Sequence, residues 1–210
     1  MHKHKNITFS YIHVIVMSKT ATEKLVIYKG AQYGALAGFI ATWSISTAIA
    51  ASEIELSMQI GTFYTVLGIA LGLNNAITSA YLTFGLHILT GTILGTIIGA
   101  LAVTWKKFTM FNPYKGTLIG TGAGITVWLV LFLPITALLI QPSTERIVTV
   151  LAVQSQQPVL SDNVNQSVRG IAISALVFHI IWGAIFGFIT SSLLKIKAFR
   201  SKIWRNELEK

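Results

Sequence analysis

LHILTGTILGTIIGAL, residues 86–101, contains no charged side chain and places a glycine at every fourth position after its histidine. Residues four apart lie on the same face of an α-helix, so the histidine and the three glycines form one stripe. In lipid, helices associate through close backbone contact at such small residues, because apolar side chains alone drive little association there. The stretch therefore predicts a membrane-spanning helix that packs closely on another helix. The stripe consists of His87, Gly91, Gly95 and Gly99.

The composition of the whole chain also indicates a membrane protein. Of its 210 residues, 53% are hydrophobic and only 11% are charged, and the mean hydropathy is +0.67. A soluble domain carries about a quarter charged residues, so this chain has too few charges to cover a soluble surface. It contains no cysteine, which excludes disulfides, zinc–thiolate sites and redox-active thiols. The predicted partner of its surface is the lipid bilayer.

Four uncharged apolar segments are long enough to cross the hydrocarbon core, which takes about 20 helical residues. They are residues 31–51, 83–104, 116–140 and 170–194, and none of them contains a carboxylate. A helix satisfies its own backbone hydrogen bonds, which lipid cannot do. The predicted fold class is therefore all-α, an integral membrane four-helix bundle.

The basic residues predict the orientation of the four spans. Fourteen of the 16 lysines and arginines lie in residues 1–30, 105–115 and 195–210, which four crossings place on one side of the membrane. By the positive-inside rule, that side is the cytoplasm. We therefore expect a multi-pass protein of the prokaryotic cytoplasmic membrane with both termini inside. The charge of +9 follows from this topology and does not indicate nucleic-acid binding. The sequence leaves open whether Met1 or Met17 is the true start.

Residues 57–73 are also apolar and carry no charge. A fifth crossing there would move Lys106, Lys107 and Lys115 to the outer side, against the charge pattern. We therefore expect an interfacial or re-entrant helix on the outer face, after the first span.

Two pairs of similar motifs indicate an internal repeat. YKGAQYGALAG begins at Tyr28 and YKGTLIGTGAG begins at Tyr114, 86 residues later; HILTGTILG begins at His87 and HIIWGAIFG begins at His179, 92 residues later. The chain is therefore predicted to be two copies of one helical hairpin, residues 31–104 and 116–194. Each copy crosses the membrane an even number of times, so both copies enter the membrane in the same direction.

Every predicted span has a face of small residues, which predicts close helix packing. The sequence does not show whether these faces meet within one chain or between chains. The glycines concerned are Gly30, Gly34 and Gly38 in the first span, Gly91, Gly95 and Gly99 in the second, Gly116, Gly120 and Gly124 in the third, and Gly183 and Gly187 in the fourth.

His87 and His179 are the candidate intramembrane polar or ligand site. Both lie about two turns inside the outer ends of their spans, where an ionisable group marks a function or a specific hydrogen bond. One interpretation is that each neutral imidazole bonds a carbonyl or hydroxyl group of a neighbouring helix. The alternatives are ligation of haem iron or another metal ion, and a proton, ion or solute pathway.

The order of these motifs resembles the YagU-like group and related uncharacterised four-helix membrane families. The resemblance covers residues 28–194 and depends on HILTGTILG, the basic loop WKKFTMFNPYKG, FLPIT and HIIWGAIFG. It implies a four-helix layout and no particular activity.

Three functions remain open at this point. The first is a non-catalytic packing or scaffold subunit of a homo-oligomer or of a larger membrane complex, without a cofactor. The second is small-solute permeation or transport along the bundle, with His87 and His179 as polar constriction groups. The third is a bis-histidine protein that binds haem b or a metal ion for redox chemistry. No nucleophile–base pair or phosphate-binding loop is present in the sequence, so no catalytic residue and no enzyme class are predicted.

Overall fold

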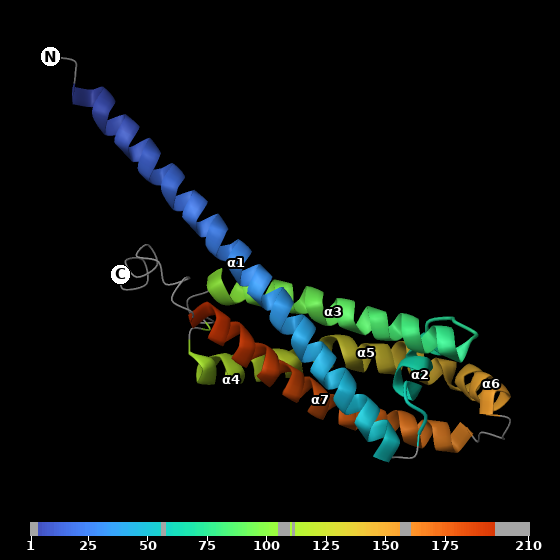
Figure 1. Ribbon diagram of the computed structural model, residues 1–210. Coiled ribbons are helices and arrows are strands. Elements are labelled where there is room, and N and C mark those ends of the chain that lie inside the picture. Colours follow the sequence, from blue (N-terminus) through green and yellow to red (C-terminus); the bar gives the residue numbers. More distant parts are fainter. Residues whose placement is uncertain (1–3, 56–57, 105–109, 111, 156–160, 196–210) are drawn as a thin grey trace.

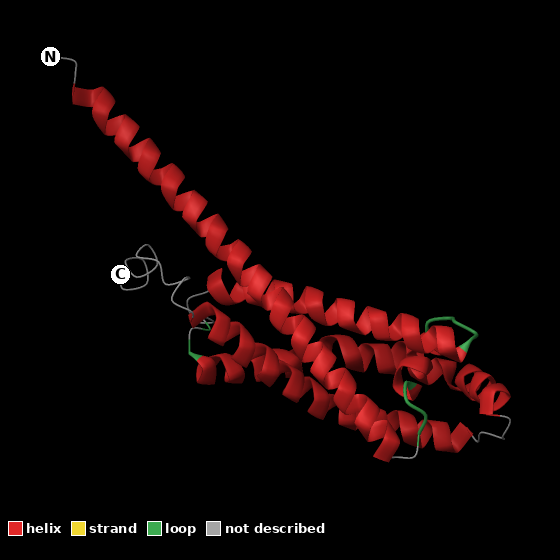
Figure 2. Cartoon of the chain, viewed as in Figure 1, coloured by secondary structure: helices red, strands yellow, loops and turns green. Residues whose placement is uncertain are grey.

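The computed structural model describes residues 4–55, 58–104, 110, 112–155 and 161–195, with the side chains of 24–152 and 173–195 within these ranges. The described residues form helices joined by short turns, without strands (Figure 2). The predicted all-α fold is therefore confirmed. The basic loop 105–115 and the basic tail 195–210 lie mostly outside the described residues, and the segment 1–30 is described from His4 onward.

The elements follow one another along the chain without a β segment among the described residues. They are α1 (His4–Glu55), α2 (Thr62–Ala70), α3 (Ala76–Thr104), α4 (Pro113–Val127), the π-helix η2 (Trp128–Phe132), α5 (Leu133–Ile135), the π-helix η3 (Thr136–Ile140), the short 3-10 helix η4 (Gln141–Ser143), α6 (Thr144–Ser155) and α7 (Ser161–Lys195).

Four helical stretches among the described residues are long and apolar enough to cross a membrane, as the sequence predicted. They are Lys24–Glu55, Ala76–Thr104, Pro113–Ala152 and Ile173–Lys195. The first three are longer than predicted. In Figure 1 the end of α3, the start of α4 and the end of α7 lie at one end of the bundle, with α2 and α6 at the other.

The glycine face of α1 packs against the glycine face of α3 in antiparallel order. A Cβ atom placed on Gly38 would come within 2.5 Å of the carbonyl oxygen of Gly91, and one on Gly34 would come within 2.8 Å of the Cα of Gly99. Gly30 lies in the same way against Gly99. No side chain fits between these backbones, so only glycine permits this approach.

The glycine face of α4 packs against α7 in the same manner. A Cβ atom on Gly120 would come within 2.8 Å of the Cα of Gly187, and one on Gly116 would come within 2.5 Å of the Ser191 side chain. Gly124 and Gly183 belong to the same contact. All eleven glycines of the predicted faces therefore pack within one chain. We call the two contacts the α1–α3 seam and the α4–α7 seam.

The two seams differ in register by one helical turn. In the aligned sequence motifs Gly124 corresponds to Gly38, and Gly183 corresponds to Gly91. Gly38 lies against the carbonyl oxygen of Gly91. Gly124, however, lies against the carbonyl oxygen of His179, four residues before Gly183. The reason is visible one turn beyond Gly38, where the small Thr42 packs directly on Gly91. The residue at the matching position of α4 is Trp128, whose indole is too large for such a contact.

The third span changes its helical geometry at Trp128. The α-helix gives way there to the π-helix η2, and a second π-helix, η3, follows the short α5 that contains Pro134. Proline lacks the N–H group that an α-helix needs, and π segments accommodate such a break. The third span therefore widens where the α4–α7 seam ends.

The short helix α2 lies across the other end of the bundle, within the segment for which the sequence predicted an interfacial or re-entrant helix. It is shorter than that segment and is flanked by Gly61 and Gly72, both with positive φ angles (90° and 107°). Such angles are accessible to glycine without strain. A Cβ atom on Gly68 would come within 2.5 Å of the Cβ of Ser79, so α2 packs tightly on α3.

Glu53 anchors the start of α2. The helix α1 extends to Glu55, beyond the predicted end of the span at residue 51, and the Glu53 side chain is 1% exposed. Its carboxylate accepts the backbone N–H groups of Gly61 (2.6 Å) and Phe63 (2.7 Å), two donors that the first turn of a helix otherwise leaves unpaired. The helix of the first span therefore continues past the predicted boundary at residue 51 and carries Glu53, a carboxylate that lies outside the predicted span.

Candidate functional site

Both predicted histidines line one cavity of about 430 Å³ between the spans. We call it the inner cavity. Its lining comes from α1, α2, α3, the third span and α7. It consists mostly of aliphatic and aromatic side chains, and the described residues that line it include no Lys, Arg, Asp or Glu. The polar groups that face it are few. They are Thr42, Tyr64, Thr83, His87, Thr90, His179 and Trp182.

His179 has a hydrogen-bond partner on its own helix. Its Nδ1 lies 2.6 Å from the carbonyl oxygen of Ala175, and because a carbonyl only accepts, Nδ1 carries the proton. In a neutral imidazole Nε2 is then the acceptor. The ring also lies against Phe132, with 5.5 Å between the ring centroids.

His87 lacks such a partner. Its Nε2 atom is buried and has no hydrogen bond to any residue that the structure describes, and the same holds for the hydroxyl group of Thr83 one turn away. Both residues line the inner cavity. A buried polar group without a partner costs about 1–3 kcal/mol, and folded proteins contain few of them. Two such groups on one wall of a cavity indicate a site for a molecule that bonds to them.

Thr42 and Trp182 connect the two helix pairs beside the inner cavity. The indole N–H of Trp182 donates to the hydroxyl oxygen of Thr42 at 2.9 Å, and Thr42 donates to the carbonyl oxygen of Gly38 at 2.7 Å. Trp182 also stacks on the fully buried Phe186, with 5.4 Å between the ring centroids. The polar atoms of this pair are satisfied, so the pair holds α1 against α7.

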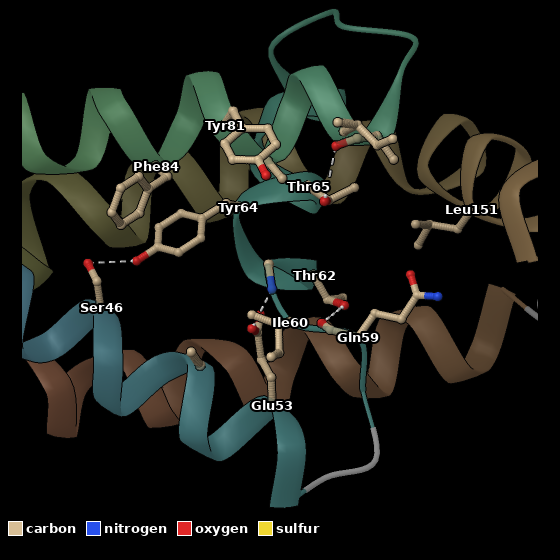
Figure 3. Close-up of a pocket in the computed structure, with 15 residues that line it drawn as sticks. Ser46, Glu53, Gln59, Ile60, Thr62, Tyr64, Thr65, Tyr81, Phe84 and Leu151 are labelled. Atoms are coloured by element: carbon tan, nitrogen blue, oxygen red, sulfur yellow. Dashed lines mark hydrogen bonds between the residues drawn. The ribbon is translucent and has the colours of Figure 1, made fainter.

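A second cavity, of about 470 Å³, lies toward the α2 end of the bundle (Figure 3). We call it the outer cavity. It is formed by the end of α1, the turn before α2, α2 itself, the start of α3 and Leu151 of α6. Its lining is more polar than that of the inner cavity. The polar residues are Ser46, Glu53, Gln59, Thr62, Tyr64, Thr65 and Tyr81.

Tyr64 of α2 lines both cavities. Its hydroxyl group donates to Ser46 Oγ at 3.0 Å, and Ser46 donates to the carbonyl oxygen of Thr42 at 2.9 Å. Its ring contacts Phe84 edge to face and lies 5.6 Å from the ring of His87. Burial raises the pKa of the Tyr64 hydroxyl, the hydrogen bond with Ser46 lowers it, and the charge of Glu53 raises it, with a net increase. The phenol is therefore protonated at neutral pH and remains a donor.

The metal and haem hypothesis has limited support from the donors present. In the part of the chain that the structure describes, no three His, Asp or Glu side chains gather closely enough to hold an ion. A metal at His87 and His179 would therefore have two protein ligands, whereas structural and catalytic zinc sites have three or four. Bis-histidine ligation of haem b stays a prediction.

Sequence reasoning identified the two imidazoles but missed Thr83, Tyr64 and Glu53. Thr83 was hidden because threonine is common in apolar spans, where it usually bonds its own helix. Tyr64 lies in a segment interpreted only for its topology, and Glu53 lies beyond the predicted end of the first span at residue 51. The glycines at the turns, Gly61 and Gly72, were the available signal that α2 is a separate element.

No family model matches the chain, and no curated protein or solved structure to which it was compared matches it. The resemblance to the YagU-like group therefore has no support from these comparisons, and the candidate site depends on its geometry alone.

Proposed function

We propose that the protein binds a small uncharged solute in the inner cavity, as a step of permeation or transport through the bundle. The observation that carries this proposal is the pair of unpartnered polar groups, His87 Nε2 and the Thr83 hydroxyl, on the wall of an otherwise apolar cavity. Its volume and lining are typical of small-molecule sites, which combine an apolar wall with a few placed polar groups.

The lining indicates the class of solute. Moving a charge into such a cavity is costly unless it is paired, and among the residues with described side chains no Lys, Arg, Asp or Glu lines this one. The solute therefore has an apolar body and one or two hydrogen-bonding groups. His87 and Thr83 bond to these groups, while His179, whose Nδ1 is already bonded to Ala175, offers its Nε2 as an acceptor.

The proposed topology places the inner cavity in the outer half of the cytoplasmic membrane. The charge pattern favours cytoplasmic termini, and Lys115 and Lys195 lie at the end of the bundle opposite α2. Both glycine seams then lie toward the cytoplasm and close that half of the bundle. We also propose that the helix pairs are copies of one hairpin and that α2 is the re-entrant or interfacial helix of the first copy. The matching motifs and the two similar seams support the first of these proposals. The charge pattern and the position of α2 at one end of the bundle support the second.

The scaffold hypothesis becomes the second candidate. Its main support was the set of glycine faces, and these faces are used between helices of one chain. One observation still favours the scaffold hypothesis. Nothing lies within 4 Å of a Cβ atom placed on Gly122 of α4, so a helix of another chain can approach this position closely. A protein that stays strictly monomeric in mild detergent would remove this candidate.

Equilibrium binding with indole as the probe tests the proposed function. Indole is uncharged and apolar and has one N–H donor, and indene has a similar shape without that donor. In lipid nanodiscs we expect saturable indole binding about fivefold tighter than indene binding, the equivalent of one hydrogen bond. His87→Leu should remove the preference for indole, whereas Ile97→Ala, at an exposed position of α3 outside the cavity lining, should keep it. Non-saturable binding, or binding that His87→Leu leaves unchanged, contradicts the proposal.

A further inference from the structure

The inner and outer cavities meet at one side chain. Each cavity has its own set of lining residues among those described, and Tyr64 is the residue common to both sets. In Figure 3 the Tyr64 ring lies between α1 and α3, with its hydroxyl group pointing to Ser46 and its ring near Phe84. Tyr64 therefore occupies the position through which a solute would pass from one cavity to the other.

The contacts of α2 indicate whether the whole helix or only the Tyr64 side chain can move away from the boundary between the two cavities. Gly68 is pressed against Ser79 with no space for a side chain, and Glu53 bonds two N–H groups at the start of the helix. At the other end, Arg146 of α6 donates to the carbonyl oxygen of Gly72 and to the Asn74 side chain. A swing of the whole helix would break all these contacts. Rotation of the Tyr64 side chain breaks one hydrogen bond and two ring contacts, so the side chain is the element that opens.

The outer cavity has the composition of a first binding site for the same solute. Its lining offers hydroxyl, amide and carboxylate groups from α1, the turn before α2 and α2, which bond the polar end of an uncharged solute. The Glu53 oxygens each accept one N–H group and retain capacity for another donor. A solute can thus keep its hydrogen bonds there before it enters the apolar inner cavity.

We propose that the outer cavity is a second, polar solute site and that the Tyr64 side chain controls passage from it to the inner cavity. This proposal rests on the proposed function, since it concerns the path to the same inner site. Tyr64 is a gating residue here: its phenol closes the path while it is bonded to Ser46, and opens it when it rotates away.

Cysteine labelling tests the gate, because the chain contains no natural cysteine. Ala175→Cys reports on the inner cavity and Ala80→Cys on the outer cavity, whose linings include these residues. The probe is methyl methanethiosulfonate, a small uncharged reagent, added to the protein in lipid vesicles, and the labelling rate of each cysteine is measured with and without a change at Tyr64.

We expect Tyr64→Ala to raise the labelling rate of the inner cysteine about tenfold or more, because it removes both the ring and the hydrogen bond. Tyr64→Phe, which keeps the ring, should raise the rate about fivefold, as expected for the loss of one hydrogen bond. Tyr64→Trp should lower the rate. The outer cysteine should be labelled at nearly the same rate in all these proteins. The graded order Ala, Phe, Tyr, Trp separates gating from a general loss of structure, which would raise both rates together.

An inner rate that is the same in all four proteins would overturn the gate, and so would a parallel rise at both cysteines. An inner cysteine that no variant exposes would overturn it as well. None of these results affects the indole measurement with His87→Leu, which tests the inner site at equilibrium. If labelling contradicts the gate but indole binding depends on His87, the proposed function is retained. If indole binding is non-saturable or unaffected by His87→Leu, the proposed function is refuted independently of the gate.

Discussion

The helix pairs α1–α3 and α4–α7 begin alike and end differently. Both pairs pack through glycines at four-residue spacing, but Thr42 extends the first seam by one turn, whereas Trp128 ends the second. Where the second seam ends, the third span changes to a π-helix whose residues line the inner cavity. The comparison indicates that the difference in size between Thr42 and Trp128 accounts for the point at which the two helix pairs diverge.

The two histidines differ in the same way. His179 bonds the carbonyl oxygen of Ala175, one turn before it, whereas at the corresponding position His87 is preceded by Thr83, and both His87 Nε2 and the Thr83 hydroxyl lack partners among the described residues. A symmetric pair of imidazoles in the sequence thus becomes one ring that is bonded to its own helix and one ring without a hydrogen-bond partner among the described residues. Both unpartnered polar groups on the wall of the inner cavity therefore belong to α3.

The largest effect on stability is expected from substitutions at the glycines where the helix backbones lie closest together. Gly120→Ala places a Cβ atom on the α7 backbone, so we expect a loss of about 3 kcal/mol or more of stability. Gly122→Ala, two residues away on the same helix with nothing within 4 Å, should instead be neutral or stabilising by up to about 1 kcal/mol, the difference in helix propensity. Thermal unfolding in detergent measures both. Equal effects of the two substitutions would mean that the α4–α7 seam is not formed as described.

The connection between the hairpins gives the next largest effect. Thr42→Val keeps the shape of the side chain but leaves the buried indole N–H of Trp182 without its acceptor, at a cost of about 1–3 kcal/mol. Thr92→Val is the matched control, because Thr92 bonds only a carbonyl of its own helix and its loss should cost less than about 1 kcal/mol. If unfolding measurements gave Thr42→Val and Thr92→Val the same loss of stability, the Trp182–Thr42 hydrogen bond would not stabilise the contact between α1 and α7.

The cap of α2 is expected to contribute less to stability. Glu53→Gln keeps the size of the side chain but can accept only one of the two N–H groups, so we expect a loss of about 0.5–2 kcal/mol. Glu55→Gln, at an exposed position two residues later, should change stability by less than about 0.5 kcal/mol. Hydrogen exchange at Gly61 and Phe63 would report the weakened cap, and unchanged protection there would contradict it.

The smallest effect, and the one of opposite sign, concerns Thr83. Thr83→Val replaces an unpartnered hydroxyl group by a methyl group of the same shape, so the protein without solute should gain about 0.5–1 kcal/mol, as expected when a binding group is removed from a site. Indole binding should become weaker at the same time. Thr83→Val that lowers stability would show that the hydroxyl group has a structural partner.

The sequence was sufficient to predict the apolar helices and their glycine faces, but not the contacts that these helices make with one another. Uncharged length predicted four spans, and four-residue spacing predicted their glycine faces, because both depend on local pattern alone. Which faces meet, and with what register, depends on Thr42 and Trp128, whose difference in size matters only once the helices are packed. The ring that lies against His87 and the hydrogen-bond partners of Tyr64 and Glu53 belong to other helices, so no local pattern contains them.

The most direct test of the central claim is the nitrogen-15 NMR spectrum of the histidine side chains in lipid, recorded while indole is added, with His87→Leu used to assign the signals. We expect the Nε2 signal of His87 to shift saturably as it gains a hydrogen-bond partner, while the Nδ1 signal of His179, already bonded to Ala175, stays in place. A His87 signal that does not change, or two histidines that respond identically, would contradict the account.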